Sequence, residues 1–246
     1  LNPQHIHCHL IRTTEYVRGI EGISKSLDFM DAFGKGMEKR ESIEPFFLKR
    51  WLFRYEKKQL FRYENRVFDF IDTFGIISEQ DKFAIMSERN KEIQIIPNGV
   101  DFEIFHPKEN YPVKYDILFM GNMGYPPNIN AVMFLANDIL PLVIKQKPHI
   151  RLLVAGVQAP ARVKKLQSAN IDVIEHFENI SDSIAVSKIM LAPMLLSIGL
   201  QNKIIQAMAM KKPCIVSKIS NNAIKAPHPQ AILEAETAEE FAAGIL

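Results

Sequence analysis

The strongest constraint on the fold is a regular alternation of short apolar segments and helical segments in the second half of the chain. The apolar segments lie at 116–120, 151–155, 172–175, 188–192 and 214–217. Helical patterns lie between them, at about 128–145, 161–169 and 200–210. Short strands that are apolar throughout pair in parallel, with helices covering both faces of the sheet. Residues from about 110 onward therefore predict a doubly wound α/β domain.

The end of the chain continues this pattern. A short strand is expected at 231–233 and a helix over 237–245. Thr237 and Glu240 have the spacing of a capping box, in which each side chain accepts a hydrogen bond from a free amide at the start of the helix.

The first 96 residues have a less regular pattern. Strands are expected at 4–11, 25–28, 74–78 and 93–96, and a long helix over 44–70. Phe53, Leu60 and Val67 recur every seven residues in that helix and predict its buried face. Ser78 is placed to cap a helix that starts near Gln80.

The segment 97–114 contains Pro97, Gly99, Pro107 and Pro112, a composition typical of a linker. Gly99 is expected to take a positive φ in a tight turn, and Phe105 to act as an apolar anchor. We therefore predict a domain at 1–96, a linker at 97–114 and a second domain at 115–246. A purely structural turn is an open alternative to a functional role for this segment.

Composition excludes several classes of protein. The chain has 246 residues, a net charge of +2, 47% apolar residues and 24% charged residues, all typical of a globular protein and not of a disordered or fibrous one. The longest apolar run, 189–196, is broken by Pro193 and is far shorter than the roughly 20 residues that span a bilayer. Cys8 and Cys214 are the only cysteines, which favours a reducing compartment.

Several motifs resemble one family. They are Ile-Pro-Asn-Gly-Val-Asp at 96–101, Phe-His-Pro at 105–107, the stretch 119–128, Leu-Val-Ala-Gly at 153–156, and 199–209 followed by Pro213. Together they resemble family-four retaining glycosyltransferases of the GT-B fold, in a bacterial subgroup linked to cell-surface and exopolysaccharide synthesis. The resemblance implies two doubly wound Rossmann-like domains with the active site in the cleft between them. Because 1–96 is short for such a domain, we expect an incomplete N-terminal domain and a chain truncated at both ends.

The expected donor is a nucleotide-diphosphate sugar. A diphosphate needs backbone amides, a glycine for close approach and a cation. Gly199 before a helix and Lys203 one turn inside it supply this set, and the resemblance places Lys203 on the diphosphate. The predicted donor site also includes Gly121 and Asn122 after a strand, together with Leu200, Asn202 and Gln206. The alternative is that Gly199 only forms a turn and Lys203 is a solvated helix lysine.

Gln206 stands where the family usually has a glutamate that binds the nucleotide ribose, and Ile198 replaces the first acid of that pair. A carboxamide still binds a hydroxyl group, but hydrogen bonds to a charged group are roughly twice as strong. We therefore expect weaker donor binding, and the activity of the chain is an open question.

A second group of candidates lies at the N-terminus. His5, His7 and His9 would share one face of a strand, with Cys8 on the other. Three histidines at this spacing are able to bind zinc, but the sequence shows no further ligand nearby, so we predict no metal and no cofactor. The resemblance implies that His9 and Arg12 are catalytic residues near the transferred sugar. A structural role for His9 is an equal alternative.

The stretch 35–66 contains ten Lys/Arg and five Asp/Glu, interleaved with aromatic residues. This pattern predicts a basic amphipathic helix that contacts an anionic membrane, or else a helix packed on its own domain with a solvated basic face. The pI of about 8.4 and the interspersed acids argue against nucleic acid as a partner.

We therefore predict a cytoplasmic retaining glycosyltransferase, peripheral to the inner face of the cell membrane. It would move a sugar from a nucleotide-diphosphate donor to a cell-surface polysaccharide or lipid-linked acceptor. The alternatives are a non-catalytic nucleotide- or sugar-binding protein of the same fold, and a membrane-docking module.

Overall fold

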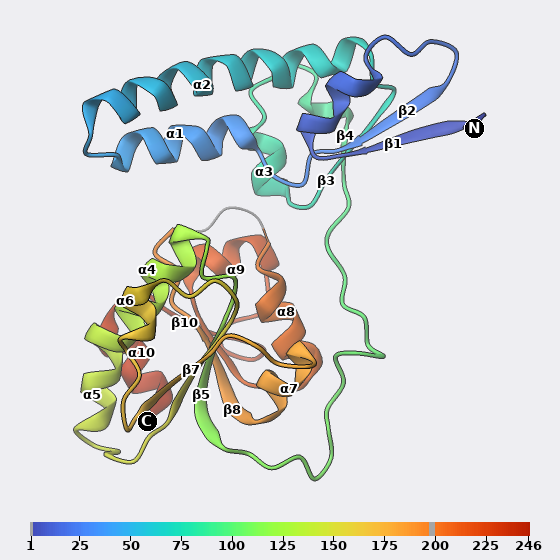
Figure 1. Cartoon of the computed structure of the whole chain (residues 1–246). Coiled ribbons are helices and arrows are strands. Elements are labelled where there is room, and N and C mark those ends of the chain that lie inside the picture. Colours follow the sequence, from blue (N-terminus) through green and yellow to red (C-terminus); the bar gives the residue numbers. More distant parts are fainter. Residues whose placement is uncertain (1, 197–199) are drawn as a thin grey trace. The chain divides into compact units, whose positions relative to one another are not determined.

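The chain forms two compact units that divide between Asn98 and Gly99, each with its own parallel sheet and core (Figure 1). The structure is a computed structural model, and it describes residues 2–196 and 200–246. The predicted α/β class with parallel sheets is confirmed.

The first unit contains a four-stranded parallel sheet in the order β1-β2-β3-β4. The strands are β1 (His5–His9), β2 (Ser24–Asp28), β3 (Thr73–Ile76) and β4 (Ile93–Ile95). All four lie within or close to the segments that the sequence predicts. Their inward side chains and those of the flanking helices form one core, in which Leu27, Phe29 and Phe74 are almost fully buried.

The long helix of the first unit is α2 (Phe47–Arg66), and α1 (Phe33–Ile43) packs beside it. The predicted helix 44–70 begins at Phe47, three residues later than expected. After Arg66 it continues as the 3-10 segment η2 (Val67–Asp69). The sequence pattern did not predict α1, because Gly34 and Gly36 lower its helix propensity.

The remaining helical segments of this unit are short: η1 (Ile11–Val17), α3 (Glu79–Ala84) and η3 (Asn90–Glu92). The predicted cap of α3 is present, because the Asp81 amide donates to Ser78 Oγ at 3.0 Å. Val67, on the predicted buried face of the long helix, lies in the core together with Phe68, but Phe53 and Leu60 of the same predicted face are only half-buried and lie outside that core.

The second unit contains a six-stranded parallel sheet in the order β10-β9-β8-β5-β6-β7. The strands are β5 (Tyr115–Met120), β6 (Leu152–Ala155), β7 (Ile171–Ile174), β8 (Ser187–Ala192), β9 (Cys214–Ser217) and β10 (Leu233–Ala235). The chain moves outward from β5 to β7 and then returns to β8 on the other side of β5. This reversal is the topological switch point at which doubly wound sheets bind ligands.

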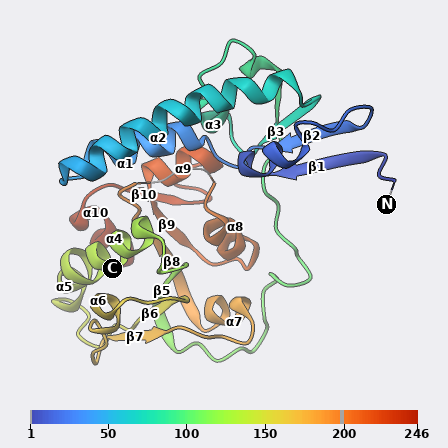
Figure 2. The same ribbon diagram turned by 45° about the horizontal axis from the view of Figure 1, so that its top comes forward.

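Helices cover both faces of this sheet (Figures 1 and 2). One face carries α4 (Pro126–Phe134), the π segment η4 (Leu135–Ile139), α5 (Leu140–Ile144), α6 (Ala161–Lys164) and α10 (Ala238–Ile245). The other carries α7 (Ile180–Ala185) and α8 (Asn202–Ala209), and α9 (Lys218–Ile224) follows β9. The sandwich of helices around a parallel sheet explains why most of the strand residues are apolar.

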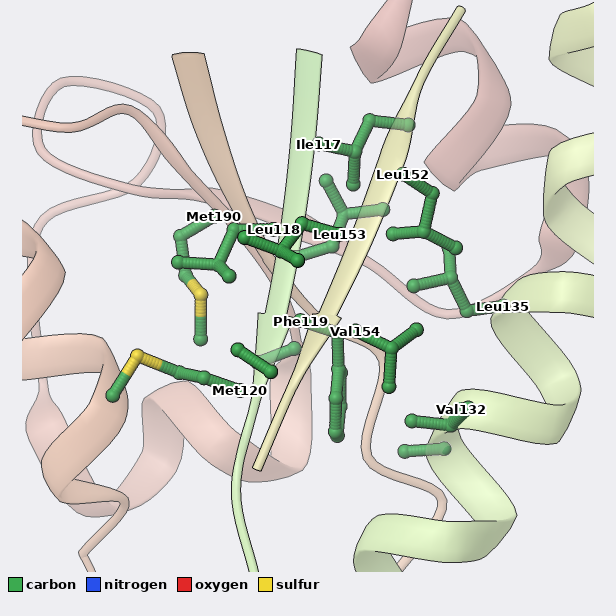
Figure 3. Packing of buried hydrophobic residues seen from close by; sticks show 14 of the residues in the cluster. Ile117, Leu118, Phe119, Met120, Val132, Leu135, Leu152, Leu153, Val154 and Met190 are labelled. Atoms are coloured by element: carbon green, nitrogen blue, oxygen red, sulfur yellow. The ribbon is translucent and has the colours of Figure 1, made fainter. Parts of the chain in front are cut away.

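The core of the second unit is centred on β5, β6 and β8 (Figure 3). Side chains of these strands pack against Val132 and Leu135 of the helix that runs over 126–144. By length and apolar composition that helical run, Pro126–Ile144, would suffice to cross a membrane. Its buried residues instead form part of the core, as those of a helix in a globular protein do.

Several local predictions for the second unit need correction. The helix predicted from Leu200 begins at Asn202, the one predicted over 161–169 ends at Lys164, and the last strand lies two residues later than expected. The short helices α7 and α9 were not predicted. The capping box of α10 is present, because the Glu240 amide donates to Thr237 Oγ1 at 3.2 Å.

The segment between the two sheets behaves in part as predicted. Phe105 is buried in the core of the second unit and thus acts as the expected apolar anchor. Gly99 does not have a positive φ, and nothing lies within 4 Å of the position that a Cβ would occupy there. The predicted tight turn at Gly99 is therefore wrong.

Candidate functional site

A cavity of about 330 Å³ opens at the carboxyl ends of β5, β6 and β7, beside α8. It lies at the edge where open α/β sheets bind their ligands. Its lining consists of Met120, Gly121, Asn122, Gly156, Val157, Glu175, His176, Phe177, Ile180, Lys203 and Gln206. Four of the predicted donor residues are in this set, and they come from two elements that are far apart in the sequence.

Two glycine turns form one wall of the cavity. Gly121 follows β5 and Gly156 follows β6, and the two backbones touch. A Cβ at Gly156 would lie 1.7 Å from the Gly121 carbonyl oxygen, and Gly156 has a φ of +153°. No residue with a side chain fits there. This contact leaves main-chain atoms, and not side chains, along that part of the cavity.

Lys203 is the one cation in the lining, and its exposed fraction is only 8%. Its Nζ donates to Asn128 Oδ1 at 2.7 Å and lies 4.4 Å from the centroid of the Phe119 ring. Met194 Sδ is a further neighbour at 3.8 Å. Burial lowers the pKa of Lys203 from 10.5 to about 7. Lys203 is therefore not a solvated helix lysine.

Asn128 is a residue of this site that the sequence analysis missed. It is 7% exposed, accepts from Lys203, and donates from Nδ2 to the Asn122 carbonyl oxygen at 2.9 Å. It thus links the turn after β5 to α8. The available signal was a polar side chain in the first turn of a mainly apolar helix.

Gln206 lies one helical turn after Lys203 and is half-buried at the cavity wall. Its carboxamide makes no hydrogen bond to any side chain or backbone atom within the described ranges 2–196 and 200–246. Its donor and its acceptor are therefore both available to a ligand in the cavity. A neutral group in this place is able to bind a hydroxyl group.

Only some of the other predicted donor residues line the cavity. Asn122 lines the cavity, and its Oδ1 accepts from the Gly124 amide at 2.7 Å. Leu200 and Asn202 are not among the lining residues, and Asn202 is exposed as the first residue of α8. Gly199 lies outside the described residues.

The far part of the cavity has a different character. Val157, Phe177 and Ile180 supply apolar atoms, and His176 supplies a ring. Glu175 accepts from the Ala159 amide at 3.0 Å and pairs with Lys164 at 2.5 Å, which lowers its pKa. The cavity therefore has a lysine and two glycine turns in one part, and apolar side chains with a histidine ring in the other. Such a lining suits a ligand that carries both an anionic group and a planar ring.

His9 and Arg12 belong to the first unit and follow the carboxyl end of β1. His9 is exposed, with Nδ1 3.9 Å from Asp28 Oδ2. The Arg12 guanidinium lies 5.2 Å from the centroid of the Phe33 ring. Leu10, between them, has a φ of +68°, a conformation that costs energy for a side chain of this size. All residues that line the cavity described above belong to the second unit.

The N-terminal histidines contact the neighbouring strand. His5 and His7 both contact Ser26 Oγ, at 2.7 and 2.8 Å, and Cys8 is buried on the opposite face as expected. Within residues 2–196 and 200–246, no group of three or more His, Cys, Asp or Glu side chains is placed to hold a metal ion.

Tyr63 and Glu64 have a clear structural role. Tyr63 Oη lies 2.9 Å from Thr14 Oγ1 and donates to Glu15 at 2.8 Å. Glu64 is 1% exposed and its Oε1 accepts from the Gly34 amide at 2.7 Å, while its Oε2 has no partner in the described chain. Burial raises the pKa of Glu64 to about 7. The two residues fasten α2 to η1 and to the start of α1.

The second unit is a parallel, doubly wound, Rossmann-like unit with a cavity at the carboxyl ends of its strands, and the fold of the chain is that of GT-B glycosyltransferases. The family model described as "Glycosyl transferases group 1" matches residues 114–246. The chain belongs to this family.

A curated relative is an uncharacterized 44.6 kDa protein in the cps region of Klebsiella pneumoniae. It is 32% identical over 115 residues, which are 40% of this chain and 30% of the relative. The matched segment therefore covers less than a third of that protein.

Three solved structures show the same fold at low identity. TarM has a TM-score of 0.70 and 14% identity, over 98% of this chain and 47% of TarM. Sucrose-phosphate synthase from Thermosynechococcus elongatus has a TM-score of 0.73 and 13% identity, over 98% and 63%. Anabaena Alr3699/HepE in complex with UDP and glucose has a TM-score of 0.72 and 12% identity, over 98% and 67%. The chain thus spans about half to two thirds of these structures.

Proposed function

We propose that this protein is a glycosyltransferase that binds a nucleoside-diphosphate sugar in the cavity of its second unit. The observation that carries the proposal is the buried amine of Lys203, which faces the cavity beside the Gly121 turn. Membership of the group 1 glycosyl transferase family supports it. The similar Anabaena protein, crystallised with UDP and with UDP-glucose, supports this class of donor.

In this proposal each cavity residue has one task. Lys203 neutralises the diphosphate, and its positive charge stabilises the leaving group when the bond to the sugar breaks. Gln206 binds a ribose hydroxyl group, and the main chain at Gly121 and Gly156 allows the phosphates to approach closely. The apolar side chains at 157, 177 and 180 pack against the base.

The remaining parts of the reaction are assigned to the first unit. We propose that His9 and Arg12 act at the transferred sugar and the acceptor, as the family resemblance implies. Transfer with retention of configuration is proposed on the same ground. The acceptor is proposed to be a cell-surface polysaccharide or a lipid-linked glycan, a class that the relative in a cps region supports. The reaction would take place on the cytoplasmic side of the membrane.

Thermal unfolding in the presence of a panel of nucleotide sugars tests the donor site. A ligand at a hundred times its Kd stabilises the folded state by about 2.7 kcal/mol, so the matching donor raises Tm measurably. Lys203→Met should abolish the rise, and Lys145→Met, on the exposed surface of the same unit, should retain it. If no nucleotide sugar and no nucleoside diphosphate raises Tm, the proposed site is wrong.

A non-catalytic nucleotide-binding protein is a second candidate, favoured by the neutral Gln206 at the cavity wall. Release of nucleotide from a labelled donor in the presence of membrane and polysaccharide fractions separates the two. Donor binding with release and glycan labelling supports the enzyme. Tight donor binding with no release from any fraction supports the binding protein.

A further inference from the structure

The α1–α2 hairpin carries a large exposed apolar surface at its turn. Its two helices run side by side and extend past the sheet of the first unit (Figures 1 and 2). Seven apolar side chains around the turn are between 45% and 76% exposed, and we call them the aromatic tip: Ile43, Phe46, Phe47, Leu48, Trp51, Leu52 and Tyr55. Soluble proteins rarely expose a patch of this kind unless it binds something.

The exposed face of α2 changes character along its length. Phe47, Trp51 and Tyr55 follow each other at helical spacing, and the Trp51 and Tyr55 rings stack with centroids 6.3 Å apart. The same stripe then continues as exposed cations, namely Lys58, Arg62 and Arg66. Over a helix of roughly 30 Å, the surface therefore passes from aromatic to basic.

A hollow of about 640 Å³ lies next to this stripe. It is lined by Arg54, Lys57, Lys58, Phe61, Arg62 and Asn65. Glu41 pairs with Arg54 at 2.7 Å and with Lys57 at 2.6 Å. Lys58 and Arg62 form no ion pair with any residue in the described part of the chain, so the hollow keeps a net positive charge. It is complementary to an anion of the size of a lipid headgroup.

We propose that this face of α2 docks the protein on an anionic lipid surface. The aromatic tip would lie at the level where headgroups meet acyl chains, which Trp and Tyr side chains favour. Lys58, Arg62 and Arg66 would contact the anionic headgroups, and the hollow would hold one of them. The combination of exposed aromatic rings with unpaired cations on one helix face favours a lipid surface over a protein partner. The proposal does not depend on donor binding in the second unit.

Trp51 makes the proposal directly testable, because it is the only tryptophan in the chain. Its side chain is 64% exposed, so its fluorescence in dilute buffer should be that of a solvated indole, quenched by iodide. Vesicles of phosphatidylcholine and phosphatidylglycerol should shift the emission to shorter wavelength and protect it from iodide. Vesicles of phosphatidylcholine alone should do neither.

Co-sedimentation with the same vesicles measures the contribution of charge. Each cation near an anionic surface raises binding by about fivefold, so Lys58→Glu with Arg62→Glu should lower it by at least about 25-fold. Lys145→Glu with Lys165→Glu is the matched control, since it makes the same change in net charge on the second unit. That control should bind almost as well as the wild type.

The apolar contribution has its own matched pair. Trp51→Ser should weaken co-sedimentation by at least about tenfold, because an indole ring leaves the interface. Phe83→Ser, at a site on α3 that is 71% exposed, should leave it unchanged. Circular dichroism and the thermal unfolding of each variant show that it is folded.

Four results would overturn the proposal. The first is equal binding to both kinds of vesicle, and the second is charge-reversed protein that binds as well as its control. The third is a Trp51 already shielded from iodide in dilute protein without lipid, which would mean that another part of the protein covers the tip. The fourth is a concentration-dependent blue shift with a doubling of mass, which would identify a second copy of the chain as the occupant.

Discussion

Binding of a nucleotide sugar should take up a proton through Lys203. The amine has a pKa of about 7 in the empty cavity because burial disfavours its charged form. At pH 8 only about a tenth of the molecules carry the charge. A diphosphate beside Nζ would return the pKa to its ordinary range near 10.5, so about 0.9 proton should be bound per ligand at pH 8 and about 0.1 at pH 6.

The affinity must follow the same linkage. The charged form binds the diphosphate, and its fraction falls as pH rises above 7, so Kd should increase about tenfold from pH 6 to pH 8. This corresponds to about 1.4 kcal/mol. The sign is specific to a lysine whose pKa is depressed, because a lysine of ordinary pKa stays charged over this range and adds no pH dependence.

Calorimetric titration with UDP-glucose, in buffers that differ in ionisation enthalpy, measures the uptake. A nucleotide sugar is the right probe, since the terminal phosphate of UDP itself titrates near pH 6. Lys203→Met should bind more weakly and lose the uptake. His176→Gln should keep it, which separates Lys203 from the histidine that also lines the cavity. Wild-type binding without proton uptake at pH 8, or uptake that survives Lys203→Met, would refute the reasoning.

Three further predictions concern single residues. The wild type should lose on the order of 3 kcal/mol of unfolding free energy as pH rises from 4.5 through 7, because Glu64 must ionise while buried, and Glu64→Gln should abolish this loss. Urea unfolding at pH 5 and pH 8 measures it, and an equal change of unfolding free energy in both proteins would contradict the prediction. Gly156→Ala should cost about 3 kcal/mol of unfolding free energy, while Gly99→Ala stays within about 0.5 kcal/mol; similar losses would disprove the backbone contact. Gln206→Glu should tighten the binding of uridine about fivefold by calorimetry, and an unchanged Kd would remove residue 206 from the ribose site.

The parts of the fold that sequence patterns predict are those with their own local signal. β6 and residues 117–120 of β5 are unbroken apolar runs, and the capping box at Thr237 is recognisable from the four adjacent residues 237–240. The helix α1 has no such signal, because its two glycines weaken it and its stability comes from packing on α2. A Pro-Asn-Gly sequence permits a tight turn without requiring one, and Gly99 does not have a positive φ.

The candidate site likewise has residues that the sequence predicted and residues that it did not. Gly121 was predicted from the ligand edge of a parallel sheet, and Lys203 and Gln206 were predicted with the help of the family resemblance; all three line the cavity. Asn128 was missed, because its role depends on a hydrogen bond to a lysine 75 positions away. The burial of Lys203 was equally hidden, since it arises from Phe119 and Met194 on other strands and loops.

The neutral side chain at position 206 and the low pKa of Lys203 are connected electrostatically. A carboxylate one helical turn from a buried amine favours its charged form, as a nearby opposite charge does in general. With a carboxamide at 206, desolvation is the only cause that acts on the pKa of Lys203, and the amine titrates near neutrality. If the proposed donor binds here, its diphosphate would itself restore the charge that Lys203 loses on burial. A carboxamide at 206 would then weaken the proposed ribose contact and at the same time make the cavity favour anions over neutral ligands.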